Sequence, residues 1–454
     1  MVEGRHSARE TFRLFLQPRQ LVVFFLGVSQ GAPNALISGT LMFWLSEVGR
    51  DNSEVGLFGL AIAFYALKPL WAPLLDQFDI PVLAKKIGSR RAWLAVLQVL
   101  LIAAITGLGM TDPENNLMAT AILAATIGFL SASQDILTDA FRIEILSDDE
   151  QGAGAAMVQF GWRTGALLTG AGTLLMAGQI GYALAFTISA FFILPGLVAA
   201  LLWGEPEHVE TPEARRIREA SEVILAARGL TGRREQIIAK LNTTILSPFR
   251  EFMTRPGWWL ILIFIPLFKL GDAVGLNQFS PFLVDLGYTA TESALANKFA
   301  GLPPLLLGIA VGGTIYYALG TFRALVVAGI MMMVTNLAFV WLAIIGHSIP
   351  GLIVTVGVEN FASGVGGTAV VAYLSALCNR SFTATQYALL AGFSLLPRGI
   401  FASFAGFISE QVSWETFWIF STLLAIPGLL LLFAMRRITF DGDGNPLRKK
   451  AAPA

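Results

Sequence analysis

The sequence is poor in charged residues. Asp, Glu, Lys and Arg together account for 14% of its 454 residues, whereas soluble globular domains carry about 25%. Hydrophobic residues reach 55%, and the mean hydropathy is +0.66. A soluble fold is therefore excluded. A disordered chain is excluded as well, because 33 Phe and 10 Trp residues are the opposite of a disordered composition. What remains is an all-α polytopic membrane protein.

Cysteine and histidine are also scarce. The single cysteine, Cys378, excludes an internal disulfide, and the three His residues lie far apart in the sequence. These counts support neither a metal site nor a His-based catalytic triad. No Gly-x-x-x-x-Gly-Lys phosphate loop occurs, which argues against direct use of ATP. The net charge is zero, so no basic field indicates nucleic acid as a partner. We expect a protein that is not an enzyme and has no cofactor.

Long apolar segments, by contrast, run through the chain. A helix needs about 20 mostly apolar residues to cross a bilayer. By this measure the sequence predicts twelve transmembrane helices, near residues 21–46, 54–76, 92–110, 117–144, 153–177, 180–203, 258–285, 292–316, 321–345, 350–378, 386–408 and 412–436. They form two groups of six. The predicted organisation is an N-terminal bundle, a linker, a C-terminal bundle and a tail, over residues 1–203, 204–257, 258–437 and 438–454.

The basic residues predict the orientation of these helices. Most of the 31 Lys and Arg residues lie in the N-terminal arm, the linker, the tail and the loops on the same side. The opposite loops hold Arg50, and Lys298 lies near the mouth of the eighth span. The positive-inside rule then places both termini and the linker in the cytoplasm. The halves also share weak similarity, with Phe129 matching Phe361, as expected of two pseudo-symmetric bundles.

Ionisable side chains within the predicted spans are the most informative residues, because each is costly there unless it is paired or hydrated. The acids are Asp135, Asp139, Asp272 and Glu359, and the bases are Lys68, Arg142, Arg163, Lys269 and Arg398. Acids and bases are nearly balanced in number. We expect such a set to surround a polar cavity between the two bundles.

The four acids are candidates for proton coupling. Asp135 and Asp139 are four residues apart and so share one face of a helix. Asp139 either takes part in coupling or forms a structural ion pair with Arg142. Asp135 lies deeper, where burial disfavours its charged form, and it either exchanges protons or pairs with Lys68 or Arg163. Asp272 and Glu359 in the second half extend this candidate set.

Cationic and amide side chains in the spans are candidates for substrate binding. Arg163 and Arg398 lie at similar depths in the fifth and eleventh spans. They either bind a substrate carboxylate through the guanidinium fork or are anchored to neighbouring acids. Lys269 either belongs to a charge ladder in the cavity or forms a static pair with Asp272. The remaining candidates suit a sugar-like or peptide-like solute and are Gln30, Asn34, Lys68, Gln134, Asn277, Gln278 and Asn360.

Several stretches share a pattern with a known family. They are Gln30-Gly31-Ala32-Pro33, the run from Tyr65 to Asp76, Ser131-Ala132-Ser133-Gln134-Asp135-Ile136 and Glu359-Asn360-Phe361. They resemble motifs of the AmpG muropeptide permeases, a branch of the major facilitator superfamily, and the resemblance covers most of residues 15–436. Pro69 departs from the pattern, because an apolar aromatic residue is expected after the lysine.

The resemblance implies a major facilitator fold and an importer in the inner membrane of a bacterium. Its cargo would be N-acetylglucosaminyl-1,6-anhydro-N-acetylmuramyl peptides, taken up by proton symport and alternating access for peptidoglycan recycling. In family members this flux also sets β-lactamase induction. Two alternatives stay open: a carrier for another amphipathic anion, such as an acyl-CoA or a drug, and a non-transporting membrane sensor. We expect a monomer whose partners are the cargo, protons and the bilayer.

Overall fold

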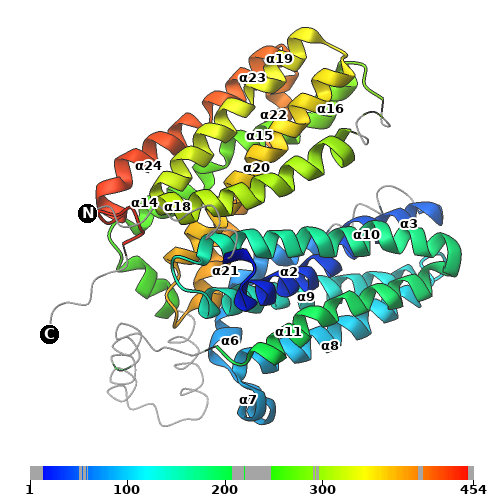
Figure 1. The fold of residues 1–454 in the computed structure, drawn as a ribbon. Coiled ribbons are helices and arrows are strands. Elements are labelled where there is room, and N and C mark those ends of the chain that lie inside the picture. Colours follow the sequence, from blue (N-terminus) through cyan, green and yellow to red (C-terminus); the bar gives the residue numbers. More distant parts are fainter. Residues whose placement is uncertain are drawn as a thin grey trace, which may run out of the picture.

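The computed structural model describes residues 14–50, 54, 58, 60–206, 219, 247–289, 292, 296–396 and 402–447. Within these residues the chain is helical, apart from loops and a single β-bridge between Phe440 and Pro446. Figure 1 shows two elongated helical bundles that approach each other at one end and diverge toward the other. In the described part, eight helical stretches are long and apolar enough to cross a membrane. The fold is therefore that of a multi-pass helical membrane protein.

The first bundle contains the helices from α2 to α11. Their bounds are α2 Pro18–Ala35, α3 Leu41–Glu47, α5 Leu60–Leu67, α6 Ala72–Gln77, α7 Pro81–Ile87, α8 Ser89–Gly109, α9 Leu117–Ile145, α10 Gln151–Ala190 and α11 Leu194–Trp203. Two predicted spans are broken by short turns. A π-helical turn, η1 (Leu36–Thr40), joins α2 to α3, and a 3-10 turn, η2 (Lys68–Leu70), joins α5 to α6. Pro69 lies in the second turn, where its missing N–H group interrupts the helical hydrogen bonds.

The second bundle contains the helices from α14 to α24. Their bounds are α14 Trp258–Phe268, α15 Leu270–Asn277, α16 Phe279–Asp285, α18 Leu302–Thr335, α19 Leu337–Ile345, α20 Ile349–Leu377, α21 Thr383–Leu396, α22 Ala402–Ser409, α23 Trp414–Leu423 and α24 Ile426–Thr439. The predicted seventh span is interrupted at Lys269 and Gln278, which separate α14, α15 and α16. Both residues are candidates for substrate binding, so two of the polar candidates lie where the helix is broken.

Two glycines redirect the chain inside long helical stretches. Gly181 has φ +78° within α10, and Gly320 has φ +74° within α18. Both values are positive, and glycine adopts them at no steric cost. Gly320 falls between two of the predicted spans, and Gly181 lies at the start of the predicted span 180–203, so that span begins a little later than predicted. The chain therefore reverses with little intervening loop.

Close helix packing holds each bundle together. A Cβ atom on Gly31 would collide with the carbonyl oxygen of Trp162, so α2 and α10 meet backbone to backbone. In the second bundle, a Cβ atom on Gly308 of α18 would collide in the same way with the carbonyl oxygen of Phe361 of α20. Small residues at such contacts let membrane helices approach closely. Both bundles thus have a core pair of helices that depends on glycine.

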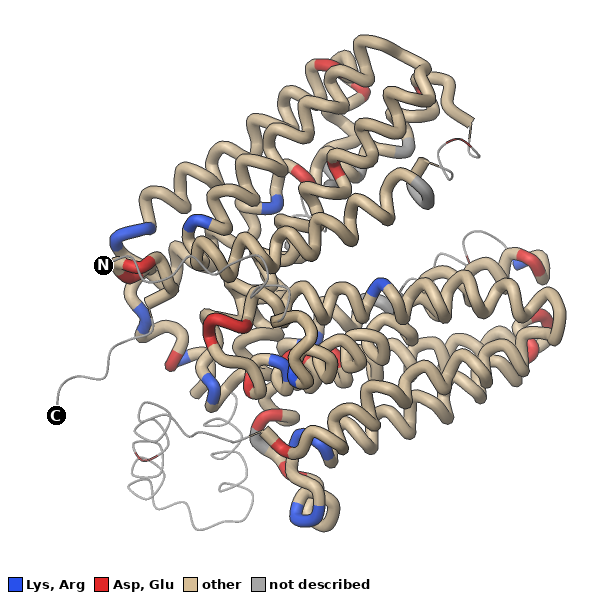
Figure 2. The backbone as a smooth tube through the Cα atoms, viewed as in Figure 1, with Lys and Arg blue, Asp and Glu red and all other residues tan. Residues whose placement is uncertain are grey.

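The two ends of the molecule differ in charge. Figure 2 shows that Lys and Arg gather mainly at the end where the bundles meet, and that the diverging end carries few of them. We call these the basic end and the open end. The described residues of the basic end include Lys85, Lys86 and Arg90, at or just before the start of α8. That the basic end faces the cytoplasm remains a prediction from the sequence.

Candidate functional site

Asp135 on α9 is the centre of a polar cluster in the first bundle. The ammonium group of Lys68 forms an ion pair with one oxygen of the Asp135 carboxylate, and the Gln30 amide donates a hydrogen bond to the other. Lys68 and Gln30 are each 5% exposed. The turn at Pro69 ends α5 next to Lys68 and so fixes the position of the ammonium group. From the sequence, Lys68 and Arg163 both stayed open as partners of Asp135, and in the structure Asp135 pairs with Lys68.

Hydroxyl and indole groups extend this cluster along the contact between α5 and α9. The Tyr65 hydroxyl lies 2.6 Å from the Ser131 hydroxyl, and the Trp71 indole N–H donates to Ser133 Oγ at 3.0 Å. Asn34 of α2 is half-buried and hydrogen-bonds Tyr65. Tyr65 and Trp71 were not among the predicted site residues, although both belong to the motif that runs from Tyr65 to Asp76. The sequence signal that could have identified these two residues is an aromatic side chain that faces a helix with polar side chains.

Gln134 points away from Asp135. It is fully buried inside the first bundle, where its amide nitrogen lies 3.3 Å from Ser29 Oγ. Gln98 of α8 reaches the same hydroxyl at 3.2 Å. Gln134 is therefore part of the interior of the bundle and does not line the space between the bundles.

Asp139 and Arg142 lie one turn apart toward the basic end of α9. Asp139 Oδ1 is 3.6 Å from Arg142 Nη2, and the Arg142 side chain is fully buried. Arg142 also donates a hydrogen bond to Ser375 Oγ of α20 at 2.9 Å. The ion pair considered for Asp139 is present, and its arginine reaches the second bundle.

A polar cavity of about 250 Å³ lies between the bundles. Its lining comes from α10 of the first bundle and from four helices of the second, and comprises Gln159, Arg163, Lys269, Asp272, Ala273, Leu276, Leu305, Ser363, Gly367, Ser394 and Leu395. It brings together three predicted site residues, Arg163, Lys269 and Asp272. The Arg163 guanidinium lies 5.0 Å from the Trp162 ring centre. Two cations beside one carboxylate suit an anionic group on a polar molecule.

The remaining candidates of the second bundle are not among the described residues that line this cavity. Glu359 of α20 is 8% exposed and is influenced by the charge of Asp272, whereas the Asn360 amide donates to the Val356 carbonyl of its own helix at 2.9 Å. Gln278 is buried and accepts a hydrogen bond from Ser409 at 3.2 Å. Arg398 and the side chain of Asn277 lie outside the part of the chain that the structure describes.

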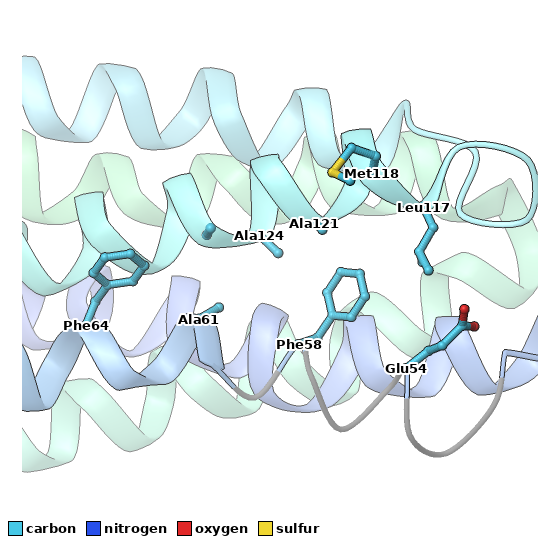
Figure 3. Close-up of a pocket in the computed structure, with 9 residues that line it drawn as sticks. Glu54, Phe58, Ala61, Phe64, Leu117, Met118, Ala121 and Ala124 are labelled. Carbon is cyan, nitrogen blue, oxygen red and sulfur yellow. The ribbon is translucent and has the colours of Figure 1, made fainter.

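A larger cavity between α5 and α9 is apolar. Figure 3 shows the side chains that surround its volume of about 500 Å³, among them Phe58, Phe64 and Met118, with Glu54 at one edge. Aromatic and alanine side chains offer no partner to the hydroxyl, amide or carboxylate groups of a polar cargo. The smaller cavity between the bundles offers such groups more polar partners.

Polar contacts join the bundles at the basic end. Arg90 of α8 is 2.7 Å from Asp76 and 2.8 Å from Glu144. Asp76 Oδ2 in turn accepts hydrogen bonds from the backbone N–H and the hydroxyl of Thr385, at 2.7 and 2.6 Å. A carboxylate of the first bundle thus binds the N-terminus of α21 in the second, where the helix dipole favours negative charge.

We call Asp76, Arg90, Glu144 and Thr385 the latch. The latch holds the bundles together at the basic end while they diverge at the open end (Figure 1). Sequence reasoning missed it, because Asp76 and Thr385 are more than 300 residues apart and neither was placed deep in a span. The structure therefore represents a state in which the two bundles are closed on one side only.

Comparison with known proteins agrees with this architecture. The Major Facilitator Superfamily model matches residues 23–358. The anhydromuropeptide permease of Escherichia coli (strain K12) is 36% identical over 428 residues, which cover 94% of this chain and 81% of that protein. A transporter of Rickettsia conorii (strain ATCC VR-613 / Malish 7), named AmpG 4, is 34% identical over 422 residues, covering 92% of this chain and 97% of that protein.

Solved structures share the fold at low sequence identity. FucP, a major facilitator transporter in the outward conformation, aligns with a TM-score of 0.64 at 14% identity, over 93% of this chain and 99% of that one. The proton:xylose symporter XylE, bound to 6-bromo-6-deoxy-D-glucose, aligns with a TM-score of 0.61 at 14% identity, over 94% and 96%. The protein thus belongs to the major facilitator superfamily of secondary transporters and, within it, to the family of the anhydromuropeptide permease AmpG.

Proposed function

We propose that the protein imports N-acetylglucosaminyl-1,6-anhydro-N-acetylmuramyl peptides across a bacterial inner membrane, coupled to protons, for peptidoglycan recycling. The observation that carries this proposal is the 36% identity, over 94% of the chain, to a protein named anhydromuropeptide permease. The same flux would contribute to β-lactamase induction. The basic end would face the cytoplasm, in keeping with the positive-inside rule.

The polar cavity supports a cargo of this chemistry. The carboxylates of a peptide stem are matched by Arg163 and Lys269, since a guanidinium binds carboxylate through two parallel hydrogen bonds. The N-acetyl groups and hydroxyls of the sugars are matched by amide and hydroxyl groups such as those of Gln159 and Ser394. The Trp162 ring beside Arg163 adds an aromatic face. Binding would take place from the open end while the latch is closed.

Proton coupling would act through the acids of the spans. In the structure, Asp135 forms an ion pair with Lys68. Uptake of a proton by Asp135 would remove that ion pair and free the ammonium group to bind the cargo. Asp139, Asp272 and Glu359 are the further acids that we propose for coupling. The proton gradient is the energy source in this scheme, with no cofactor.

We propose the same organisation for the whole chain that the sequence predicts. Twelve spans in two bundles, over residues 1–203 and 258–437, would rock about the central cavity, with both termini in the cytoplasm. The linker over 204–257 lies largely outside the described residues, and the tail begins at residue 438. One copy holds a complete cavity within the described residues, which supports a monomeric transporter.

Uptake by the purified protein in proteoliposomes tests this function. With labelled anhydro-muropeptide and an acidic exterior, we expect accumulation that a protonophore abolishes. Arg163→Ala should raise the KM for the peptide-bearing cargo more than for the peptide-free anhydro-disaccharide, because the arginine is assigned to the carboxylates. Absence of muropeptide uptake by a preparation that melts cooperatively would refute the cargo, and uptake of an acyl-CoA instead would assign another amphipathic anion.

A further inference from the structure

Arg142 is a fully buried arginine that joins three helices. Its Nη2 atom donates a hydrogen bond to Ser375 of α20 at 2.9 Å, and its guanidinium carbon is 5.4 Å from the ring centre of Tyr387 of α21. Both partners belong to the second bundle, whereas Arg142 belongs to α9 of the first. Each rocking movement that separates the bundles at the basic end must break both contacts.

The counter-charge of Arg142 comes from its own helix. Asp139 Oδ1 is 3.6 Å from Nη2, and Asp139 is itself 6% exposed. Within the described residues, the Nε and Nη1 atoms of Arg142 have no hydrogen-bond partner. The other ionisable groups that act on Asp139 or on Tyr387 are Lys68, Asp135 and Cys378. The guanidinium is thus balanced by one carboxylate in a buried site.

We propose that Arg142 is a positioning residue of the transport cycle, which converts protonation of Asp139 into opening of the basic end. This inference rests on the proton coupling proposed above. While Asp139 is ionised, the pair is neutral overall and stays buried between closed bundles. Once Asp139 binds a proton, the closed state holds a buried cation without its partner, which is strongly unfavourable. Opening the basic end admits water to the guanidinium and removes this cost.

Arg90 in the latch does not lose its counter-charge when a single neighbouring carboxylate binds a proton. It contacts two carboxylates, Asp76 and Glu144, at 2.7 and 2.8 Å. Protonation of either one leaves the other as counter-charge, so the closed state keeps a paired cation. Arg142 has a single carboxylate within ion-pair distance among the described residues, and one proton is enough to leave it unpaired.

The accessibility of one thiol measures this opening. Cys378→Ala removes the only native cysteine, and Ala384→Cys introduces a thiol on α21 at a position that is fully buried against the first bundle. The rate of maleimide labelling is measured in nanodiscs across acidic to alkaline pH, with and without anhydro-muropeptide. In this parent variant we expect labelling to become faster as the pH falls.

Asp139→Asn imitates the protonated carboxyl and should make labelling fast at every pH, by about tenfold or more at alkaline pH, since removing one partner of a buried ion pair shifts an equilibrium by more than one decade. Adding Arg142→Met removes the cation that Asp139→Asn leaves unpaired and should return labelling to the slow rate. Arg142→Lys keeps the charge and should keep the pH response. A merely structural role for Arg142 predicts no such reversal.

Arg255→Met is the matched control. Arg255 is also buried, and it pairs with Glu251 one turn away at 2.8 Å. Its other hydrogen bonds in the described part of the chain go to Leu377 and Gln386, and neither of these residues lies in the first bundle. Added to Asp139→Asn, this variant should leave labelling fast. Slow labelling in that combination would mean that the removal of any buried arginine favours the state closed at the basic end. That result would contradict a specific role of Arg142.

Two results would overturn the inference: a parent variant without pH response, or a rapid Asp139→Asn variant that Arg142→Met does not reverse. If Asp139→Asn fails to fold, Arg142→Met alone decides. Labelling that no longer becomes faster as the pH falls then supports the inference, because the cation that a proton on Asp139 would leave unpaired is gone. An unchanged pH response refutes it. Because labelling does not require the cargo to be transported, a pH-responsive protein that accumulates no muropeptide would refute the proposed cargo and leave this inference intact.

Discussion

The ion pair of Lys68 and Asp135 depends on one proline. Pro69 interrupts the helix directly after Lys68, and the ammonium group meets a carboxylate of α9 as a result. Burying either charge alone is costly, and the pair is tolerated because each supplies the counter-charge of the other. The sequence pattern flagged Pro69 as a departure from the family. In the structure it is the residue that ends α5 beside the site.

Asp135→Asn should abolish proton-driven accumulation while substrate binding remains, because an amide keeps the shape of the carboxyl and loses its titration. It should also lower the free energy of unfolding by about 3 kcal/mol, since Lys68 loses its counter-charge. Binding is measured by titration calorimetry, accumulation in proteoliposomes, and stability by chemical denaturation.

The double variant Lys68→Met/Asp135→Asn separates the two effects. It should recover most of the stability, because the unpaired cation is gone, and none of the accumulation. Glu114→Gln, at an exposed loop carboxylate outside the spans, serves as the control and should leave both quantities unchanged. Wild-type accumulation in Asp135→Asn would refute the assignment of Asp135 to coupling.

At the scale of helices, α2 and α10 form a contact that depends on glycine. A Cβ atom on Gly161 would collide with the carbonyl oxygen of Phe24. Gly161→Leu should therefore lower the free energy of unfolding by about 3 kcal/mol, the upper range for an overpacked contact, and lower the melting temperature in detergent. Gly172→Leu on the same helix is the control, since nothing lies within 4 Å of a Cβ atom there. Equal melting temperatures for the two variants would contradict this packing argument.

The positions of the helices followed from the sequence better than their interruptions. The predicted spans near 92–110 and 117–144 correspond to α8 and α9, because long apolar runs of this length have to be helical in a membrane. The breaks at Lys269, Gln278 and the π-helical turn η1 were not predicted, since counting apolar residues does not detect a local change of backbone angle.

For the candidate site, the sequence likewise identified the types of residue involved, but it did not give the directions in which their side chains point. Charged residues in apolar runs identified Asp135, Lys68 and the cavity residues Arg163 and Lys269. The rotation of α9 about its axis decides that Gln134 faces the interior of the bundle. This rotation was not predicted, because it depends on how the neighbouring helices pack. Hydrophobic period alone gives no face for a helix whose exposed side and buried side are both apolar, as Met118 and Ile122 on the exposed side of α9 illustrate.

At the scale of the whole molecule, the latch decides which side of the transporter is closed. Asp76→Asn weakens the ion pair with Arg90 and the cap on α21 together. We expect it to shift the protein toward opening at the basic end, seen as faster labelling of Ala384→Cys in the Cys378→Ala background. The change should amount to about fivefold, less than for Asp139→Asn, because Glu144 remains as the counter-charge of Arg90 and only the hydrogen bonds to Thr385 are weakened, by about 1 kcal/mol.

Asp79→Asn provides the control for the latch. Asp79 is an exposed acid three residues beyond Asp76, and its replacement should leave labelling unchanged. Identical labelling in Asp76→Asn and the parent would show that the latch does not hold the bundles together. The latch itself had no sequence signature, because contacts between residues so far apart depend on the assembled bundles.

The pairing of charges inside the transporter also has an electrical consequence in the proposed cycle. Lys68 with Asp135, and Arg142 with Asp139, each carry no net charge when both members are ionised. These two ion pairs therefore move little net charge through the membrane field when the empty transporter returns. Each proton bound before the inward step adds one elementary charge, which is worth about 2.3 kcal/mol per 100 mV. Membrane voltage thus acts on the loaded step through the protons and the cargo, and these two ion pairs add no net charge to the return step.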